Sequence, residues 1–307
     1  MVIVQTLIEI KLLLEERGLR PKRSLGQNFL IDHNLIRKLI AASGVNRGDL
    51  VLEIGPGTGT MTEELLARGC RVVACELDDQ LADLLRERLP HLPGGELFTL
   101  IHRDCLEGKH ALAPEILLAL ADKAPNGAIA PFSLVANLPY GAGTPVITTL
   151  LLQHPSCHTL AVTIQREVAD RLAAKPSTKD YGALAVIAQV VATVERVATA
   201  PPECFWPRPE ITSSMVLLRR RPDPLTRDFQ GLSELCRMIF AQRRKQIGSV
   251  IGKNVDWAAI SAATGCEGLR PAQRAEELSP IQIVHLGRAL GQVDKISSTL
   301  RQTDDTL

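Results

Sequence analysis

The sequence predicts an α/β protein with a mostly parallel sheet covered by helices on both faces, followed by a small C-terminal α-helical domain. Between about residues 49 and 218, short β-branched runs alternate with longer helical segments, as in a parallel sheet with crossover helices. After residue 221 the pattern is helical and rich in Ala, Arg and Gln. We therefore expect a first domain over residues 1–221, a helical domain over 222–295 and a polar tail over 296–307.

Five runs are apolar over most of their length, as strands buried on both faces of a parallel sheet are. They lie at 50–54, 71–75, 97–101, 133–136 and 160–164. A later run at 214–218 is expected to pair antiparallel at an edge of the sheet. The first fourteen residues place apolar side chains at helical spacing and predict an amphipathic helix. The segment 111–131 is long for a strand connection and indicates an insertion with a Leu-rich helix.

The composition is that of an ordinary globular protein, with 307 residues of which 45% are hydrophobic and 22% charged. No stretch approaches the roughly 18 apolar residues that a membrane span needs, and the N-terminus lacks the basic start of a signal peptide. The seven cysteines are dispersed and form no Cys-x-x-Cys pair. We therefore expect no disulfide, no metal, no membrane association and a cytoplasmic location.

The net charge of +1 is unevenly distributed along the chain. Residues 219–253 contain nine Lys or Arg and three Asp or Glu, and a second basic group lies at 17–23. Basic clusters on a weakly charged protein indicate a polyanionic partner. Solvated helix faces are the alternative interpretation, and charge alone does not decide between the two.

The most specific local pattern is the glycine-rich turn at 55–59, which follows a predicted strand containing Glu53. Alternate glycines let the backbone turn sharply and approach a ligand closely. Glu76 ends the second strand, where a carboxylate can accept both hydroxyls of a ribose. Asp104 follows the third strand and can accept from an adenine amine. This order of groups resembles class I (Rossmann-like) methyltransferases, which use S-adenosyl-L-methionine, better than it resembles NAD-dependent enzymes.

The fourth predicted strand runs into the loop Asn137-Leu138-Pro139-Tyr140. An adenine amine is a poor nucleophile, because its lone pair is delocalised into the ring. The Asn137 side-chain oxygen and the Leu138 carbonyl can accept from the two amine hydrogens and so favour a pyramidal nitrogen. Tyr140 offers a stacking face and Pro139 stiffens the loop. The alternative is an ordinary turn after a strand, which Asn and Pro often form.

Several motifs occur in the order found in the KsgA family of ribosomal RNA adenine dimethyltransferases, which the chain resembles from about residue 18 to 290. These motifs lie at 24–30, 137–140, 165–168, 181–182, 205–209, 243–245 and 274–279. The resemblance implies dimethylation of two adjacent adenosines near the 3′ end of small-subunit ribosomal RNA, within a pre-ribosomal particle. It also implies S-adenosyl-L-methionine as cofactor, with the protein monomeric away from the ribosome.

The resemblance further implies a role for each matched position. The implied catalytic residues are Asn137, Leu138, Pro139, Tyr140 and Phe205, with Tyr140 and Phe205 sandwiching a flipped adenine. The implied cofactor-binding residues are Gln27, Asn28, Leu30, Glu53, Gly55, Gly57, Gly59, Glu76, Leu77, Asp104, Cys105 and Asn137. The implied RNA-binding residues are Arg23, Arg208, Arg243, Arg244 and Lys245.

The chain departs from the family pattern in two places near the expected substrate pocket. Residues 141–143 are Gly-Ala-Gly in place of a polar Asn-Ile-Ser-like stretch, and 211–213 are Ile-Thr-Ser in place of a Val-Asp-Ser-like stretch. Three alternative functions remain: a large-subunit ribosomal RNA adenine methyltransferase, a DNA adenine methyltransferase, and a non-catalytic assembly factor. Leu138 and the motif at 274–279 oppose the first alternative. The second lacks an apparent target-recognition domain, and the intact cofactor motifs oppose the third.

Overall fold

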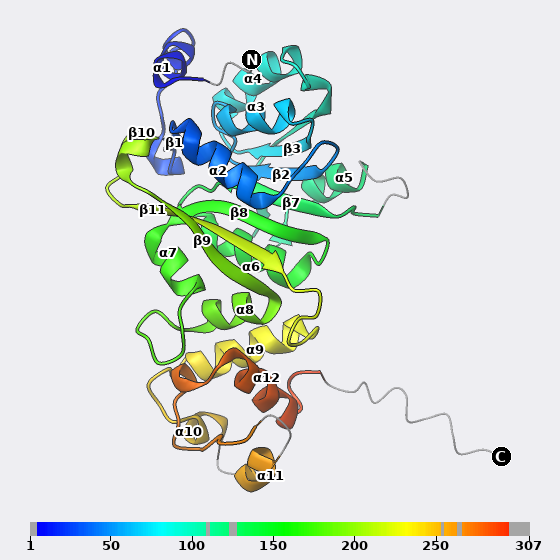
Figure 1. Ribbon diagram of the computed structural model, residues 1–307, viewed down its shortest axis with the longest axis vertical. Coiled ribbons are helices and arrows are strands. Elements are labelled where there is room, and N and C mark those ends of the chain that lie inside the picture. Colours follow the sequence, from blue (N-terminus) through cyan, green and yellow to red (C-terminus); the bar gives the residue numbers. More distant parts are fainter. Residues whose placement is uncertain (1–4, 109–110, 123–127, 253–254, 263–265, 295–307) are drawn as a thin grey trace, which may run out of the picture. The chain divides into compact units, whose positions relative to one another are not determined.

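The computed structural model describes residues 5–108, 111–122, 128–252, 255–262 and 266–294 (Figure 1). The chain divides into two compact units. The first comprises Met1–Ala173 and Ala192–Arg220, and the second comprises Ala174–Val191 and Arg221–Leu307. The stretch Ala174–Val191 therefore belongs with the C-terminal helices, although it precedes the last strands of the sheet.

A seven-stranded sheet with the strand order β4-β3-β2-β7-β8-β11-β9 forms the centre of the first unit. The strands are β2 (Leu50–Ile54), β3 (Arg71–Glu76), β4 (Phe98–His102), β7 (Phe132–Asn137), β8 (Cys157–Gln165), β9 (Ala192–Ala200) and β11 (Ser213–Arg220). The first five are mutually parallel, and β11 is antiparallel to both of its neighbours. The predicted parallel sheet is confirmed, with each of the five strands within three residues of its expected bounds.

The prediction that the run at 214–218 lies at an edge of the sheet was wrong. This strand, β11, lies between β8 and β9, and β9 forms the edge. Residues 213–218 are all buried, as an interior strand requires, whereas Glu195 and Arg196 of β9 are exposed. Strand β9 was not predicted from the sequence, because its mixture of Thr, Glu, Arg and Ala lacks the continuous apolar run of the other strands.

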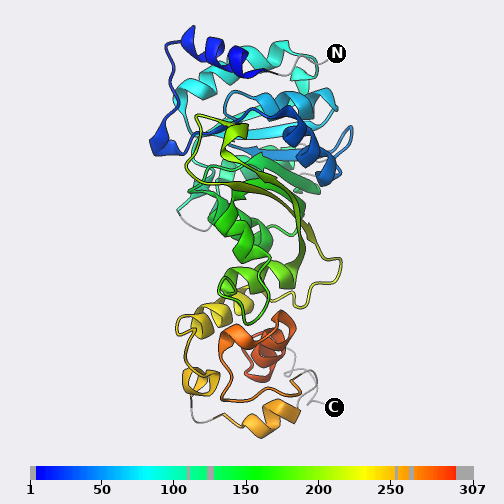
Figure 2. The ribbon, with the colours of Figure 1, turned by 60° about the vertical axis from the view of Figure 1, so that its left-hand side comes forward.

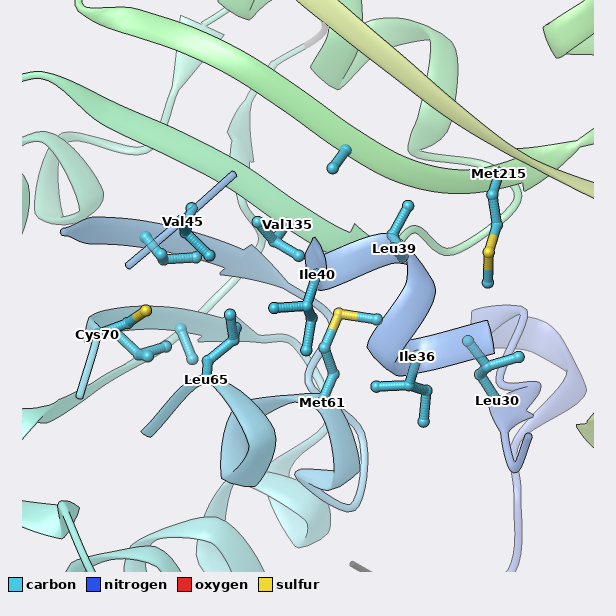
Figure 3. Packing of buried hydrophobic residues seen from close by; sticks show 14 of the residues in the cluster. Leu30, Ile36, Leu39, Ile40, Val45, Met61, Leu65, Cys70, Val135 and Met215 are labelled. Carbon is cyan, nitrogen blue, oxygen red and sulfur yellow. The ribbon is translucent and has the colours of Figure 1, made fainter. Parts of the chain in front are cut away.

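Helices cover both faces of this sheet (Figure 1). On one face lie α2 (His33–Ser43), α3 (Thr60–Ala67) and α4 (Asp79–Arg88); on the other lie α5 (Pro114–Asp122), α6 (Gly143–Gln153) and α7 (Arg166–Leu172). Figure 3 shows the core beneath α2, where Ile36, Leu39 and Ile40 meet Met61 and Leu65 of α3. Each of these side chains is at most 5% exposed, so burial of apolar area holds the helices to the sheet.

The N-terminal helix predicted for residues 1–14 is confirmed over α1 (Leu7–Glu15), while residues 1–4 lie outside the described residues. A capping box formed by Thr6 and Glu9 begins the helix. Ile10 and Leu14 are buried in a cluster with residues of α4, and Ile8 and Leu12 are exposed. The helix thus buries one face as predicted, but its exposed face also carries apolar side chains, so it is less amphipathic than expected.

The helix expected within an insertion at 111–131 is a regular part of the sheet architecture. It is α5, which packs on β3 and β4 and buries Ile116 and Leu120. It thereby makes the crossover between β4 and β7, which are separated in the sheet by β3 and β2. Residues 123–127, in the second half of this segment, lie outside the described residues.

Two short strand pairs lie outside the main sheet. They are β1 (Phe29–Leu30) with β10 (Phe205–Trp206), and β5 (Leu106–Glu107) with β6 (Ala111–Leu112). Short 3₁₀ helices occupy Arg23–Leu25, Leu89–His91, Gly95–Leu97, Pro202–Cys204 and Ala275–Glu277. The β1–β10 pair matters for the site, since it joins an N-terminal segment to one that lies some 175 residues further along the chain.

The second unit is helical, as predicted. Its helices are α8 (Ala183–Val191), α9 (Phe229–Phe240), α10 (Ile247–Ile251), α11 (Trp257–Ala262) and α12 (Pro280–Ala289). Figure 2 shows α8, α9 and α12 gathered together, and they pack against one another. Tyr181 is fully buried beside them and donates to the Leu278 carbonyl at 2.7 Å. The predicted polar tail, 296–307, lies outside the described residues.

Candidate cofactor and substrate site

A cavity of about 360 Å³ opens in the first unit at the carboxyl ends of β2, β3, β4 and β7. Parallel strands bring their carboxyl ends to one edge of a sheet, which is where ligands bind in open α/β folds. Of the residues expected to bind cofactor or substrate, the cavity is lined by Gln27, Asn28, Leu30, Glu53, Gly55, Glu76, Leu77, Asp104, Cys105, Asn137, Leu138, Pro139, Tyr140 and Phe205. Gly57 and Gly59 are not among its lining residues.

The glycine-rich turn leaves β2 with a left-handed backbone at Gly55 (φ 68°) and at Gly57 (φ 61°). Only glycine adopts this conformation without strain. A Cβ on Gly57 would lie 2.8 Å from the ring of Phe29, and one on Gly55 would lie 3.0 Å from Pro139. The turn therefore makes room for neighbouring protein segments as well as for a ligand.

Glu76 at the end of β3 is buried and binds backbone on both sides. One oxygen, Oε2, accepts from the Gly57 N–H at 3.1 Å; the other accepts from the N–H groups of Leu77 and Asp78 at 2.9 Å each. Burial raises the pKa of this carboxyl, and the backbone hydrogen bonds oppose the increase. Each carboxylate oxygen has two lone pairs, and three of the four are occupied, so Glu76 keeps one free acceptor position, on Oε2, for a ligand hydroxyl.

Glu53 lies in β2 before the turn and is almost completely buried. Its Oε2 accepts from the Thr62 hydroxyl at 2.7 Å, which joins the strand to α3. Burial raises the pKa of Glu53 to about 8, the Thr62 hydrogen bond opposes this, and the charge of Glu76 adds to it. Two acidic side chains thus share one poorly solvated wall, a suitable environment for a cationic ligand.

Beyond β4, Asp104 accepts from the Leu106 N–H through Oδ1 at 2.9 Å. Its neighbour Cys105 is buried, and burial raises the pKa of this thiol to about 12. Cys105 is therefore a neutral, apolar part of the wall and is not a nucleophilic thiolate. Leu77 is 47% exposed although it lines the cavity, so it offers an apolar surface to a planar ring.

Asn137 is the last residue of β7, and its amide has a defined orientation. Its Nδ2 donates to the Asn28 carbonyl at 2.9 Å, which leaves Oδ1 as the side-chain acceptor. The following Leu138 N–H donates to the Thr163 carbonyl at 3.1 Å, and the Leu138 side chain is buried. The loop is thus fixed at its start by bonds to two different segments.

Tyr140 is held from the opposite side. Its hydroxyl and the hydroxyl of Ser213 lie 3.1 Å apart in a hydrogen bond. Ser213 begins β11 and is fully buried. Ser213 lies in the second stretch that departs from the family pattern, and its role could not be predicted because no local pattern connects it with a loop 73 residues earlier.

Phe205 reaches the cavity through the β1–β10 pair. It lies opposite Leu30, while Trp206 lies opposite Phe29 and stacks on it with ring centroids 6.2 Å apart. Phe205 is 3% exposed and also belongs to the hydrophobic core that includes α2. The residue expected to sandwich a base is therefore positioned by the same segment that carries the N-terminal cofactor residues.

The basic residues expected to bind RNA have different surroundings. Arg23, Arg244 and Lys245 are exposed. Arg208 is also exposed and forms an ion pair with Glu203. Arg243 is half-buried within the second unit, where it forms an ion pair with Glu276 and donates to the Thr178 carbonyl at 3.2 Å. Its guanidinium is therefore already used inside that unit.

The described residues contain neither a metal-binding cluster nor a membrane-spanning helix. No group of three or more His, Cys, Asp or Glu side chains in that part of the chain could hold a metal ion. No helix in the same part has the length and apolar character needed to cross a membrane.

A mostly parallel seven-stranded sheet with one antiparallel strand, a glycine-rich turn and acidic groups at successive strand ends defines a class: the S-adenosyl-L-methionine-dependent class I methyltransferases. Residues 18–290 match the family model described as ribosomal RNA adenine dimethylase, and the chain belongs to this family. The resemblance, the fold class, the cofactor and the enzymatic class inferred from the sequence are thereby confirmed.

Curated relatives agree over almost the whole chain. The ribosomal RNA small subunit methyltransferase A of Mycobacterium bovis (strain BCG / Pasteur 1173P2) is 39% identical over 303 residues, covering 95% of this chain and 90% of that protein. The protein of the same name from Shouchella clausii (strain KSM-K16) is 37% identical over 299 residues, covering 95% of each chain.

Solved structures agree on the fold. The 23S rRNA methyltransferase ErmE has a TM-score of 0.63 at 25% identity, covering 86% of this chain and 99% of that one. A dimethyladenosine transferase from Plasmodium falciparum has a TM-score of 0.65 at 20% identity, covering 83% and 94%. The second similarity supports the fold alone.

Proposed function

We propose that this enzyme dimethylates the exocyclic amines of two adjacent adenosines near the 3′ end of small-subunit ribosomal RNA, within a pre-ribosomal particle. The observation that carries the proposal is the oriented amide of Asn137. Because its Nδ2 is bound by the Asn28 carbonyl, Oδ1 can accept from the amine of a base in the cavity. The choice of the small subunit is supported by the names of relatives that are 37–39% identical over 95% of the chain.

The mechanism requires positioning more than acid–base chemistry. Asn137 Oδ1 and the Leu138 carbonyl accept from the two amine hydrogens, so that the nitrogen becomes pyramidal and directs its lone pair at the methyl carbon. When bound in this cavity, S-adenosyl-L-methionine would supply an electrophilic methyl group with a neutral thioether as the leaving group. The amine nitrogen, positively charged after transfer, releases its extra proton to solvent.

The remaining cavity residues bind the two reactants. We assign Glu76 Oε2 to a ribose hydroxyl and Asp104 to the adenine amine of the cofactor, with Leu77 and Cys105 beside the adenine ring. Glu53 and the turn at 55–59 are assigned to the methionine end. Tyr140 and Phe205 hold the flipped target base between their rings.

We infer that exposed basic side chains bind RNA phosphates, with Arg23 and Arg208 in the first unit and Arg244 and Lys245 in the helical domain at 222–295. Phosphate contacts position the RNA without reading its sequence. Within the helical domain, Arg243 contributes beside Arg244 while bound to Glu276. We also propose a cytoplasmic location and a monomeric state away from the ribosome; the seven free thiols support a reducing compartment.

The decisive experiment is methyl transfer from labelled cofactor to unmethylated small subunits and, separately, to unmethylated large subunits, followed by nucleoside analysis. We expect dimethyladenosine in the small-subunit sample alone. Transfer only to large subunits would replace the substrate assignment with the activity in the name of ErmE, whose structure is similar. Transfer to neither, with intact subunit binding, would leave the non-catalytic assembly factor.

A further inference from the structure

Asp78, at the turn between β3 and α4, connects three parts of the cofactor cavity. Its Oδ1 caps α4 by accepting from the N–H groups of Gln80 at 3.0 Å and Leu81 at 3.2 Å. Its Oδ2 accepts from the Lys22 ammonium at 2.7 Å and from the Gln27 amide at 3.0 Å. One carboxylate therefore caps the start of a helix and also binds an N-terminal segment more than 50 residues away.

The segment 22–28 is fixed at both of its ends. At the first end, Lys22 is bound through Gln27, whose Oε1 accepts from the Lys22 N–H at 2.7 Å while its Nε2 donates to Asp78. Both polar atoms of Gln27 are therefore bound to protein groups. At the other end, the Asn28 carbonyl accepts from Asn137. Between them, a Cβ on Gly26 would lie 3.5 Å from the Tyr140 nitrogen. The segment therefore lies against the catalytic loop and forms one wall of the cavity.

Asp78 is also linked to the carboxylate assigned to the cofactor ribose. Its backbone N–H donates to Glu76 Oε1 at 2.9 Å, and Glu76 Oε2 accepts from Gly57. A shift of Asp78 would displace one of the three backbone donors that hold Glu76. The N-terminal segment, the ribose carboxylate and the glycine-rich turn are thus joined by one continuous series of hydrogen bonds.

The charges at Asp78 make this connection strong. Its side chain is 2% exposed, whereas that of Lys22 is 42% exposed. Burial alone would raise the pKa of Asp78, but hydrogen bonds from Lys22, the Leu81 backbone and Gln27 outweigh it and lower the pKa. The carboxylate is therefore ionised at neutral pH. Charge-assisted hydrogen bonds to a shielded carboxylate are stronger than exposed ion pairs.

We propose that Asp78 is a positioning residue for cofactor binding: through Lys22 and Gln27 it holds segment 22–28 across the cofactor cavity. Gln27 is then also a positioning residue, because both of its polar atoms bind protein groups. The proposal rests on the cofactor site assigned above. Its test measures cofactor binding without RNA, so its failure is distinguishable from failure of the proposed RNA substrate.

The variants must separate the helix cap from the contact with the segment. Asn and Ser both cap helices well, so Asp78→Asn and Asp78→Ser keep the cap of α4 and remove the charge that binds Lys22. Lys22→Gln removes the same ion pair without touching α4. Glu87→Gln is the matched control, since it breaks the exposed Arg17–Glu87 pair on the same helix.

Titration calorimetry with S-adenosyl-L-methionine and with S-adenosylhomocysteine should show about tenfold weaker binding for Asp78→Asn, Asp78→Ser and Lys22→Gln. The double variant Asp78→Asn with Lys22→Gln should be no weaker than either single variant, and Lys22→Arg should restore most of the affinity. Glu87→Gln should bind as the unaltered enzyme does. Melting temperatures of the single variants should stay within a few degrees of the unaltered enzyme.

Unchanged cofactor affinity in Lys22→Gln would overturn the proposal, whether or not the Asp78 variants fold. Weakened binding in Asp78→Ala alone, with normal binding in the Asn and Ser variants, would also overturn it, because the effect would then come from the lost helix cap. Additive losses in the double variant would show that the two residues act separately and would equally contradict the proposal.

Discussion

The cofactor half of the cavity and its base half are built in different ways. In the cofactor half, Glu53, Glu76 and Asp104 stand at or near the ends of adjacent parallel strands, and backbone N–H groups hold the last two. In the base half, the Tyr140 hydroxyl is hydrogen-bonded to the Ser213 hydroxyl of β11, and Phe205 is positioned by the two-residue pairing of β1 with β10. The sheet itself fixes the first geometry, whereas a few long-range contacts fix the second.

This difference has a consequence for substitutions. A change in the cofactor half should alter cofactor affinity, since the groups there are those that we assign to the cofactor or that hold them. A change in the base half should alter methyl transfer and leave cofactor affinity nearly unchanged. Asn137 lies where the two halves meet, because its side chain is bound to Asn28 and its backbone begins the catalytic loop.

The largest effect should come from Asn137→Ala. Loss of an acceptor aligned with the reacting amine should lower the rate of transfer roughly 100- to 1000-fold, as loss of one preorganised polar group does elsewhere. Calorimetry should show a much smaller loss of cofactor affinity, at most about tenfold, because the variant also releases the Asn28 end of segment 22–28. Asn137→Asp is the informative partner, since it keeps an acceptor and loses the bond to Asn28. Collapse of cofactor affinity in Asn137→Ala would place this residue in the cofactor half instead.

Glu53, in the cofactor half, should make the stability of the enzyme depend on pH. Burial raises the pKa of Glu53 to about 8 from an ordinary value of 4.5, so the folded state favours the neutral carboxyl. Its contribution to stability is therefore complete below pH 4.5 and is lost as pH rises through 8, by roughly 3 kcal/mol between pH 5 and 8. Denaturant unfolding should show this decrease in the unaltered enzyme.

Glu53→Gln should unfold with a flatter pH dependence over the same range, because the titrating group is gone. Bound cofactor should also flatten it in the unaltered enzyme, since a cation beside Glu53 favours the carboxylate. An identical slope for the enzyme and the Gln variant would assign the titration to another group.

The basic residues of the helical unit should affect neither half of the cavity. Arg244→Ala and Lys245→Ala should each weaken binding to small subunits and reduce the slope of log affinity against log salt by about one. Arg243→Ala should reduce this slope less, because its guanidinium is shared with Glu276, and should also lower the stability of the helical unit by about 1 kcal/mol through the lost contacts with Glu276 and Thr178. A salt slope that changes equally in all three variants would remove this distinction.

The smallest effect should come from the support of Tyr140. Ser213→Ala should lower kcat/KM for small subunits about three- to tenfold, because one buried hydrogen bond of ordinary strength is lost. Tyr140→Phe should have a similar effect, and the double variant should be no worse than either single one. Ser213→Thr keeps the hydroxyl and serves as the control. A change in cofactor affinity in Ser213→Ala would mean that the two halves are not independent.

The sequence by itself determined most of the local structure. Five parallel strands, the helix of the N-terminal segment and the glycine-rich turn all follow from patterns within five to fifteen residues, because burial on one or two faces imposes a period on the side chains. The same patterns indicated the acids at the strand ends and the family. Edge strand β9 escaped because half of its side chains are exposed and carry no such period.

Only the tertiary structure decided how the site is held. The bond between Asn137 and Asn28 spans 109 residues, that between Tyr140 and Ser213 spans 73, and that between Gln27 and Asp78 spans 51. The order of strands in the sheet brings these partners together, and no local pattern records that order. For the same reason, both polar atoms of Gln27, a residue expected to bind the cofactor, form hydrogen bonds with protein groups. Arg243, expected to bind RNA, likewise forms an ion pair with Glu276.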